Sequence, residues 1–345
     1  MIRAKKHIRQ MLFLLAAGLL AGCSGSESDD VNELKPELTN EAEMTEITVK
    51  TNLSGMLTKT GPAIVNSNSD LHSYDLKIDA YFHGTETAYL SGTKLHYDSS
   101  VPAAWKFWVG SAPGSETHYY WPIEGSVYDP ASANITVSSL DFVGYCPFEK
   151  PSYIGTPTYN HSTGVSFTCD MSDYMTLDDQ EDMDEFIVSV LPNQTLATQT
   201  AAGGALPMVF KHPLALIKFT ITAASGTHVQ INSIKLTGLK TGGTCTYNGT
   251  TMLWNELTGS ADMTLTQTLK NGGTTEGTPF MVIPNNYGSK FLTVNTTWDD
   301  WSDVTLSDYG TDVDFDWEPG YIYTYNLTLD KYILKVDIEK YTEQW

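Results

Sequence analysis

The sequence has little positive charge. Its 345 residues include 20 Lys and Arg against 41 Asp and Glu, so the formal net charge is −21 at pH 7. A chain of this charge repels a phosphate backbone, which excludes nucleic-acid binding. Charged residues of both signs make up only 18% of the chain. With 27 Gly and many Thr and Tyr, this composition argues against a coiled coil, a helical bundle or a disordered chain.

Residues 1–22 have the features of an export signal. The segment begins with four basic residues, Arg3, Lys5, Lys6 and Arg9. The apolar run from Met11 to Leu20 is too short to cross a bilayer of about 30 Å as a helix. The run ends in Leu20-Ala21-Gly22-Cys23, which resembles a bacterial lipobox. The sequence therefore predicts cleavage before Cys23 and acyl chains such as palmitate on Cys23, the alternative being ordinary secretion with a Cys there by chance.

The segment after Cys23 is acidic and polar. Residues 24–30 read Ser-Gly-Ser-Glu-Ser-Asp-Asp, which resembles the surface-export signal of Bacteroidetes lipoproteins. The alternative is a solvated tether without that role. Because residues 23–46 offer almost no apolar side chain for packing, we expect an acidic flexible tether there. Strand-like sequence begins near Ile47.

Three cysteines follow Cys23, namely Cys146, Cys169 and Cys245. In an exported chain Cys146 and Cys169 could form a disulfide, but an odd count leaves one thiol free. No CxxC pair or Cys/His spacing indicates zinc. The favoured interpretation is three small buried residues.

Alternation of apolar and polar residues dominates the C-terminal half. In Tyr321 to Leu329 the odd positions are apolar or aromatic, and Met263 to Leu269 alternates in the same way. The runs 214–221 and 280–283 are continuously apolar, as expected of strands that are buried on both faces. No segment keeps the 3.6-residue period of a helix for three turns. The sequence therefore predicts an all-β chain of antiparallel sandwiches.

The N-terminal half carries similar strand patterns. They lie around residues 76–82, 105–109, 119–121 and 140–145. A polar stretch from Asn193 to Gly204 precedes the strongly apolar run that begins at Pro207. We therefore expect two sandwich domains, 47–205 and 206–345, each of an ordinary domain size.

Motifs of catalysis or metal binding are missing. The sequence contains no HExxH, GxSxG, P-loop or dinucleotide-binding pattern. His212 lies in an apolar segment, where a core imidazole is favoured over a ligand. The acidic run from Asp170 to Glu185 offers oxygen ligands for Ca²⁺ but lacks the register of an EF-hand, which favours a solvated loop. An enzyme such as a glycosidase has only the surplus of carboxylates in its favour, so we expect no catalytic residue, metal or cofactor.

Aromatic residues gather in one short region. They are Trp105, Phe107, Trp108, Tyr119, Tyr120 and Trp121. Exposed aromatic rings stack on sugar faces, so all of these residues except Phe107 are candidates for binding a surface glycan. The favoured alternative is that they fill a sandwich core, because each ring buries a large area.

Several motifs, in order, resemble the fimbrillin family of Bacteroidetes, which comprises major and accessory pilins. The motifs are Tyr119 to Pro122, Leu140 to Pro147, Phe210 to Phe219, Val282 to Pro284, Pro319 to Leu329 and the tail Tyr341 to Trp345. They cover nearly the whole chain. The resemblance implies two tandem transthyretin-like β-sandwiches in a non-catalytic fimbrial subunit or adhesin. It also implies an outer-membrane lipoprotein at the cell surface.

The resemblance also implies partners and a mode of assembly. The partners would be other fimbrial subunits, either copies of this chain or paralogues, and a host or bacterial surface glycan or protein. A trypsin-like protease would remove the first strand together with the lipid. A strand from a neighbouring subunit would then fill the open groove by β-augmentation.

The processing site departs from the family pattern. Both arginines of the chain lie in the export signal, so an Arg-specific protease cannot cut the mature protein. Lys59-Thr60 lies where the family has its arginine site, after the candidate strand Ile47–Leu53. Either a protease that accepts Lys cuts between Lys59 and Thr60, or the chain keeps its lipid and serves as an anchor or accessory subunit. The end at Trp345, soon after the strand pattern of 332–338, favours the second outcome.

Overall fold

Strands dominate the protein, as the period-two patterns predict. The computed structural model describes residues 44–53, 67–100, 102–109, 115–129, 134–181, 183–223, 229–265, 269–270, 274–298, 305–330, 333–337 and 343–344. The predicted signal, Cys23 and nearly all of the tether lie outside these residues, as do Lys59 and Thr60. None of the helices in the described part has the length and apolarity needed to cross a membrane.

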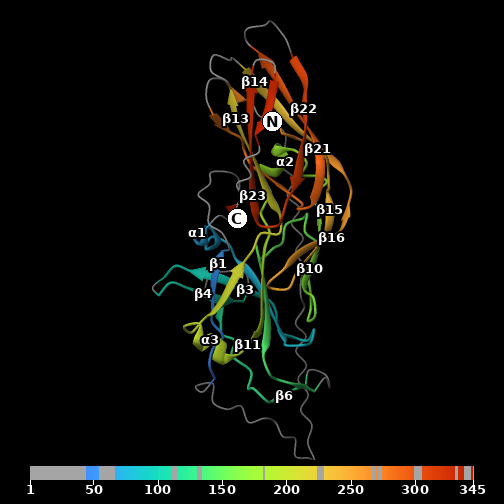
Figure 1. Ribbon diagram of the computed structural model, residues 1–345. Helices are drawn as coiled ribbons and strands as arrows, with labels where there is room; N and C mark the ends of the chain where they lie inside the picture. The colour runs from blue at the N-terminus through green and yellow to red at the C-terminus, as the bar shows by residue number, and fades with distance from the viewer. Residues whose placement is uncertain are drawn as a thin grey trace, which may run out of the picture. The chain divides into compact units, whose positions relative to one another are not determined.

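A six-stranded antiparallel sheet organises the first part of the chain (Figure 1). Its strands, in spatial order, are β11 (Ile187–Gln194), β8 (Leu140–Cys146), β2 (Leu76–Phe82), β3 (Ala88–Asp98), β4 (Ala104–Trp108) and β5 (Glu116–Thr117). Strand β2 alternates strictly, since every second side chain from Leu76 to Phe82 is buried. Every residue of β8 is buried, because this strand has a hydrophobic core on each of its faces.

The first core lies on the face of this sheet that β1 (Val49–Leu53) and β12 (Leu206–Phe210) cover. Two short helices, α1 (Asn68–Leu71) and α3 (Leu196–Ala201), lie next to these strands in the chain and contact β1 through side chains and backbone. The hairpin of β6 (Val127–Tyr128) and β7 (Ile135–Thr136) forms a separate two-stranded sheet.

The second core lies between β8, β11 and a four-stranded sheet. The order of that sheet is β16 (Met252–Thr258), β15 (Gly242–Tyr247), β10 (Gly164–Asp170) and β9 (Thr158–Asn160). Cys169 and Cys245 belong to this core and Cys146 to the first core. All three are free and buried, so the interpretation as small core residues is confirmed.

The C-terminal sandwich encloses the third core (Figure 1). One sheet contains β19 (Thr274–Glu276), β13 (Ala215–Ala223), β23 (Tyr321–Asp330) and β24 (Ile333–Asp337), with β20 (Phe280–Val282) on β13 and β25 (Glu343–Gln344) on β23. The other contains β17 (Ala261–Leu265), β14 (Val229–Leu239), β21 (Asn286–Trp298) and β22 (Thr305–Asp316), with β18 (Leu269–Lys270) on β14. The prediction of an all-β sandwich chain is confirmed. The expectation that its strands pair only in antiparallel fashion is wrong, because β13 pairs in parallel with β23 and β1 in parallel with β12.

Strands from beyond residue 205 pair with strands before it. Strand β12 pairs with β1, and β15 pairs with β10. The division into domains 47–205 and 206–345 stays a prediction. In both of these sheets a strand of one predicted domain pairs with a strand of the other.

The acidic run from Asp170 to Glu185 is not simply a solvated loop. It contains the short helix α2 (Leu177–Glu181), in which Leu177 and Gln180 are buried. The Gln180 amide donates to the carbonyl oxygen of Met281 and accepts from its N–H, so it imitates a strand partner. The acidic pattern alone gives no sign of this contact, because Gln180 finds its partner in a distant part of the sequence.

Candidate strand-binding site

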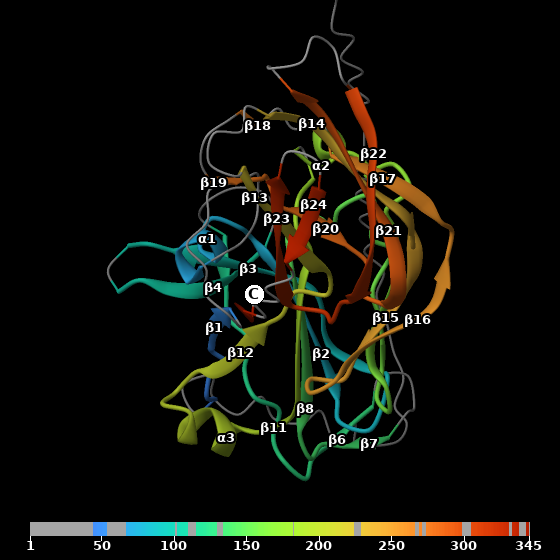
Figure 2. The same cartoon turned by 45° about the horizontal axis from the view of Figure 1, so that its top comes forward.

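Strand β1 is held at the edge of the first core. It pairs in parallel with β12, from Val49 opposite Leu206 to Leu53 opposite Phe210, and these two strands form a sheet of their own (Figure 2). The side chains of Ile47, Val49 and Leu53 are only 1%, 5% and 4% exposed. Lys50 and Asn52, which alternate with them, are exposed. The predicted strand Ile47–Leu53 is therefore confirmed over Val49–Leu53, and it buries one face.

The floor beneath β12 is closely packed. Leu206, Met208 and Phe210 have no exposed surface and point into the first core. Gly144 of β8 allows this approach, since a Cβ there would lie 2.8 Å from Cδ1 of Ile78 and 2.9 Å from Cε of Met208. Strand β12 is also anchored on its other side, because Val188 and Lys211 exchange two backbone hydrogen bonds of 3.0 and 2.9 Å. The strand that pairs with β1 thus also has contacts in which β1 takes no part.

The segment before β1 pairs with a different partner. The N–H of Ile47 donates to the carbonyl oxygen of Tyr119 at 2.7 Å, and the N–H of Trp121 donates to that of Thr45 at 3.0 Å. Glu46 and Tyr120 form an antiparallel bridge between these contacts. Residues 119–121 are therefore a docking edge for the segment 45–47 rather than the strand that the sequence predicts.

Gln199 of α3 lies where the chain changes from one partner to the other. Its side-chain oxygen Oε1 accepts from the N–H of Thr48 and from Nε1 of Trp121, both at 3.1 Å. Its Nε2 donates to the carbonyl oxygen of Glu46 at 2.9 Å. Gln199 is only 4% exposed, so these contacts are shielded from water.

The sequence does not mark Gln199 as a site residue, because the stretch from Asn193 to Gly204 is polar and predicts only a connection. One local signal was present. Thr195 and Thr198 form a capping box at the start of α3, with each side chain bonded to the other residue's backbone N–H. That pattern predicts a helix start, but nothing local indicates that Gln199 contacts residues more than 150 positions away.

Further polar contacts hold β1 along its length. Nζ of Lys50 donates to the carbonyl oxygen of Ala202 at 2.6 Å, and the hydroxyl of Thr48 donates to that of Gly204. At the other end, Oδ1 of Asn68 accepts from the N–H of Leu53 at 2.8 Å. Both helices therefore contribute polar groups to β1.

An ion pair lies at the entrance to the groove. Nδ1 of His118 is 2.7 Å from Oε1 of Glu46, and both side chains are largely exposed. The hydrogen bond to Glu46 raises the pKa of His118 above its usual 6.5. Protonation of His118 therefore favours the docked position of the segment 45–47.

The candidate glycan-binding aromatics are mostly part of the groove. Trp105 and Trp121 are 9% and 7% exposed and belong to the first core, and the half-buried Tyr119 packs edge-on against Phe107. Half-buried Tyr120 accepts a hydrogen bond on its carbonyl oxygen from Tyr89. Trp108 is half-buried and lies over the ring of His96, with 4.1 Å between the ring centres. These positions favour the core alternative, and glycan binding stays a prediction.

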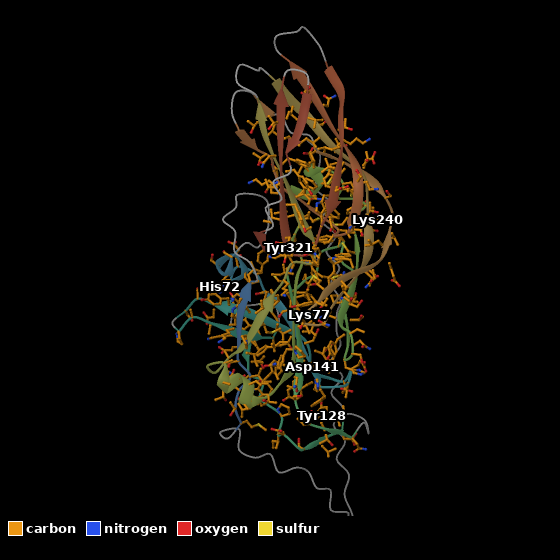
Figure 3. All side chains as sticks on the ribbon, in the orientation of Figure 1. His72, Lys77, Tyr128, Asp141, Lys240 and Tyr321 are labelled. Atoms are coloured by element: carbon orange, nitrogen blue, oxygen red, sulfur yellow. The ribbon has the colours of Figure 1, made fainter. Side chains whose placement is uncertain are left out.

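Two buried acidic groups outside the groove have their polar partners in place. The carboxylate of Asp141, labelled in Figure 3, accepts from the Tyr159 hydroxyl at 2.7 Å and from the N–H of Asn193 at 2.6 Å, and lies 2.8 Å from Nδ1 of His83. Burial, together with the hydrogen bond to Asp141, raises the pKa of Tyr159. Glu185 lies 2.5 Å from Nδ1 of His212, so the interpretation of His212 as a core imidazole is confirmed. Among the described residues, no cluster of His, Cys, Asp or Glu could hold a metal ion.

The model of the fimbrillin-like family matches residues 131–345, more than half of the chain. The chain therefore belongs to the fimbrillin-like family.

Solved structures share the fold. A fimbrial protein from Bacteroides vulgatus ATCC 8482 is 14% identical, with a TM-score of 0.56 over 86% of this chain and 99% of that one. A candidate cell adhesion protein from Bacteroides ovatus ATCC 8483 is 12% identical, with a TM-score of 0.52 over 88% of this chain and 98% of that one. At these identities the likeness concerns the fold alone. No curated protein matches the sequence.

Proposed function

We propose that this protein is a fimbrial subunit of the bacterial surface in which β1 is exchanged for a strand of a neighbouring subunit. Family membership supports a fimbrial or adhesive role at the cell surface. One observation carries the finer proposal. Strand β1 completes the first core with three buried side chains, yet it has a single strand partner in a sheet of only two strands.

The energetics suit an exchange between subunits. Burial of a large aliphatic side chain contributes about 1.5–3 kcal/mol, so Ile47, Val49 and Leu53 together contribute about 5–9 kcal/mol. Loss of β1 uncovers this surface and the free edge of β12, while Lys211 and Val188 still hold β12 in place. A strand from a second copy or a paralogue recovers both the apolar burial and the backbone hydrogen bonds.

Release of β1 needs a cut between β1 and α1. The connection runs from Leu53 to Asn68 and includes Lys59-Thr60, which we propose as the cleavage site of a protease that accepts Lys. In the precursor, acyl chains on Cys23 would hold the subunit on the outer membrane. A cut after Lys59 would separate the lipid and β1 from the rest of the subunit. A subunit that stays uncut would keep its anchor.

The test uses lipid-free protein that begins at Ser24. Limited trypsin treatment should produce a new N-terminus at Thr60, found by mass spectrometry, followed by ladders that resist SDS. Lys59→Ala should remove both the cut and the ladder. Unchanged polymers from Lys59→Ala would contradict the cleavage assignment, and a cut product that stays monomeric would contradict exchange between copies of this chain.

A role in glycan binding has less support. Only Trp108 and the two tyrosines of the candidate set keep part of their surface accessible, and Tyr119 and Tyr120 dock the segment before β1. We therefore propose a non-catalytic protein whose chief partners are other fimbrial subunits.

A further inference from the structure

The inward face of β1 has one polar side chain among aliphatic ones. Thr51 alternates with Val49 and Leu53, and the ladder places it opposite Met208 of β12. Met208 has no exposed surface, and it belongs to the first core together with Val49 and Leu53. Thr51 therefore has apolar neighbours along its own strand and across the ladder. We call the position that Thr51 occupies the central site.

The hydroxyl group at the central site lacks a partner. Thr51 is half-buried, but its Oγ1 is shielded from water and has no hydrogen-bond partner among the residues that the structure describes. Other polar groups of the same segment are bonded, since the hydroxyl of Thr48 donates to the carbonyl oxygen of Gly204. A buried hydroxyl without a partner loses its hydrogen bonds to water and gains none in return, which weakens the docking of β1.

An aliphatic side chain suits the central site better than Thr51 does. Val has a methyl group where Thr has its hydroxyl, and both residues are branched at Cβ, so they share a stiff χ1 and a preference for strands. A strand with Val at the central site would therefore keep the shape of β1, remove the unpaired hydroxyl and bury more apolar surface. By this argument β1 is a weaker occupant of its groove than a strand that differs only at this position.

We propose that the central site determines which strand the groove prefers, and that it favours a neighbour's strand with an aliphatic residue there over the chain's own β1. Ile47, Val49 and Leu53 hold β1 on the core of the uncut subunit. The incoming strand matches these three positions and gains its advantage at the fourth. The preference of the central site rests on the contacts of β1 alone, whereas its role in the choice of a neighbour's strand rests on the proposed function.

Hydrogen exchange in the uncut protein tests the preference of the central site. In lipid-free protein that begins at Ser24, Thr51→Val should slow deuterium exchange of residues 44–53 about tenfold after correction for intrinsic rates, because it removes a buried unpaired hydroxyl. Thr48→Val is the matched control. It makes the same change in a side chain that has a partner, Gly204, so exchange of this segment should become faster. Equal or faster exchange in Thr51→Val would overturn the proposal.

Peptides added to an open groove test the selection of a strand. The receptor is the same protein with Val49→Asp, in which the buried charge should expel the protein's own β1. Labelled peptides of residues 44–53 carry the parent sequence, Thr51→Val or Thr48→Val, and fluorescence anisotropy gives their affinities. The Thr51→Val peptide should bind about tenfold more tightly than the parent peptide, and the Thr48→Val peptide more weakly. A Thr51→Val peptide that binds no better than the parent would overturn the proposal.

The two proposals fail in different ways. If the Val49→Asp receptor does not fold, the exchange measurement on the uncut protein decides the preference of the central site by itself. Neither measurement needs a cut after Lys59 or a polymer. A protein that prefers Val at the central site but never polymerises would refute strand exchange between copies and leave the central site as assigned. Polymers without this preference would refute the assignment and leave the strand exchange intact.

Discussion

Strands β1–β12 and β13–β23 are both parallel pairs, but they differ in their surroundings. Strand β13 pairs with β23 over eight positions, from Leu216 opposite Ile322 to Ala223 opposite Leu329. Each of these two strands also bonds to other strands, β13 to β19 and β20 and β23 to β24 and β25. The pair β1–β12 has five positions and no further strand in its sheet.

Strand β13 is an integral part of its sheet, whereas β1 mainly covers one face of the first core. Strand β13 is buried on both faces, since Leu216 belongs to the second core and Ile217 to the third. Its loss would break a sheet and open two cores. Strand β1 buries one face in the first core, so its loss would uncover a groove and leave every other sheet paired. This makes β1 the strand suited to exchange.

Replacing one buried aliphatic residue of β13 and one of β1 by Asp should show the difference between the two pairs most strongly. Ile217→Asp places an unpaired carboxylate between two strands in the third core and should prevent folding, since such a change costs several kcal/mol. Val49→Asp should instead expel β1 and leave a folded remainder. Circular dichroism melting would give the global effect, and mass spectrometry after brief proteolysis would show whether cleavage is confined to residues 44–53.

Equal unfolding of the two variants would contradict the comparison, because β1 would then be as integral to the fold as β13. Lys50→Asp is a useful control for the second variant. Lys50 is exposed on the same strand, so a carboxylate there loses one contact with Ala202 but buries no charge.

The strands were predictable because their signal is local. Strand patterns in the N-terminal half give β2 at Leu76–Phe82 within the same bounds and β8 around residues 140–145, and continuous apolar sequence gives β13. Helices α1, α2 and α3 were missed because four to six residues are too few to show a helical period. The parallel pairing of β1 with β12 could not be predicted either. More than 150 residues separate the two strands, and the local sequence pattern of a strand does not indicate which distant strand it pairs with.

The site was predictable only in part for the same reason. The strand Ile47–Leu53 follows from its sequence, and Tyr119 to Trp121 attract notice as an aromatic motif. Their relation does not follow, because the motif docks the strand through backbone groups that every residue has. Gln199 is the extreme case, a polar residue in a polar stretch whose three partners all come from other parts of the chain.

Crowding beneath β12 offers a milder way to loosen β1. Gly144→Ala would place a Cβ 2.8 Å from Cδ1 of Ile78, 2.9 Å from Cε of Met208 and 3.1 Å from Cζ of Phe210, so the ends of these side chains, two of which belong to β12, must move. Overpacking of this kind costs about 1–3 kcal/mol. Because β1 bonds to β12, the backbone amides of β1 should exchange with deuterium faster in this variant, as hydrogen-exchange mass spectrometry of residues 44–53 would show.

Gly243→Ala is the matched control for that measurement. Its Cβ would lie 2.8 Å from Cδ2 of Leu257, a similar overlap in the four-stranded sheet, to which β1 does not belong. Both variants should melt earlier than the parent. Only Gly144→Ala should accelerate exchange in β1, and equal acceleration in both would mean that β1 responds to overall stability rather than to the position of β12.

The smallest effect expected is a pH dependence at the start of the groove. Glu46 raises the pKa of His118 above 6.5, with a weaker contribution of the same sign from Glu116 and an opposing one from Lys106. A raised pKa in the docked state means that the stabilisation is complete below pH 6.5 and is lost as the pH rises through the higher value. The amide of Ile47, which bonds to Tyr119, should therefore be better protected at pH 6 than at pH 8 after correction for the intrinsic exchange rate.

The pair is exposed, so the change in protection should stay within about fivefold. His118→Gln keeps a polar side chain without a proton to gain, and it should remove the pH dependence while leaving the exchange of β12 amides as in the parent. A pH dependence that persists in His118→Gln would assign it to another group. If the parent protein shows none, the ion pair contributes nothing to docking, and the segment 45–47 is held by Gln199 and the edge at 119–121 alone.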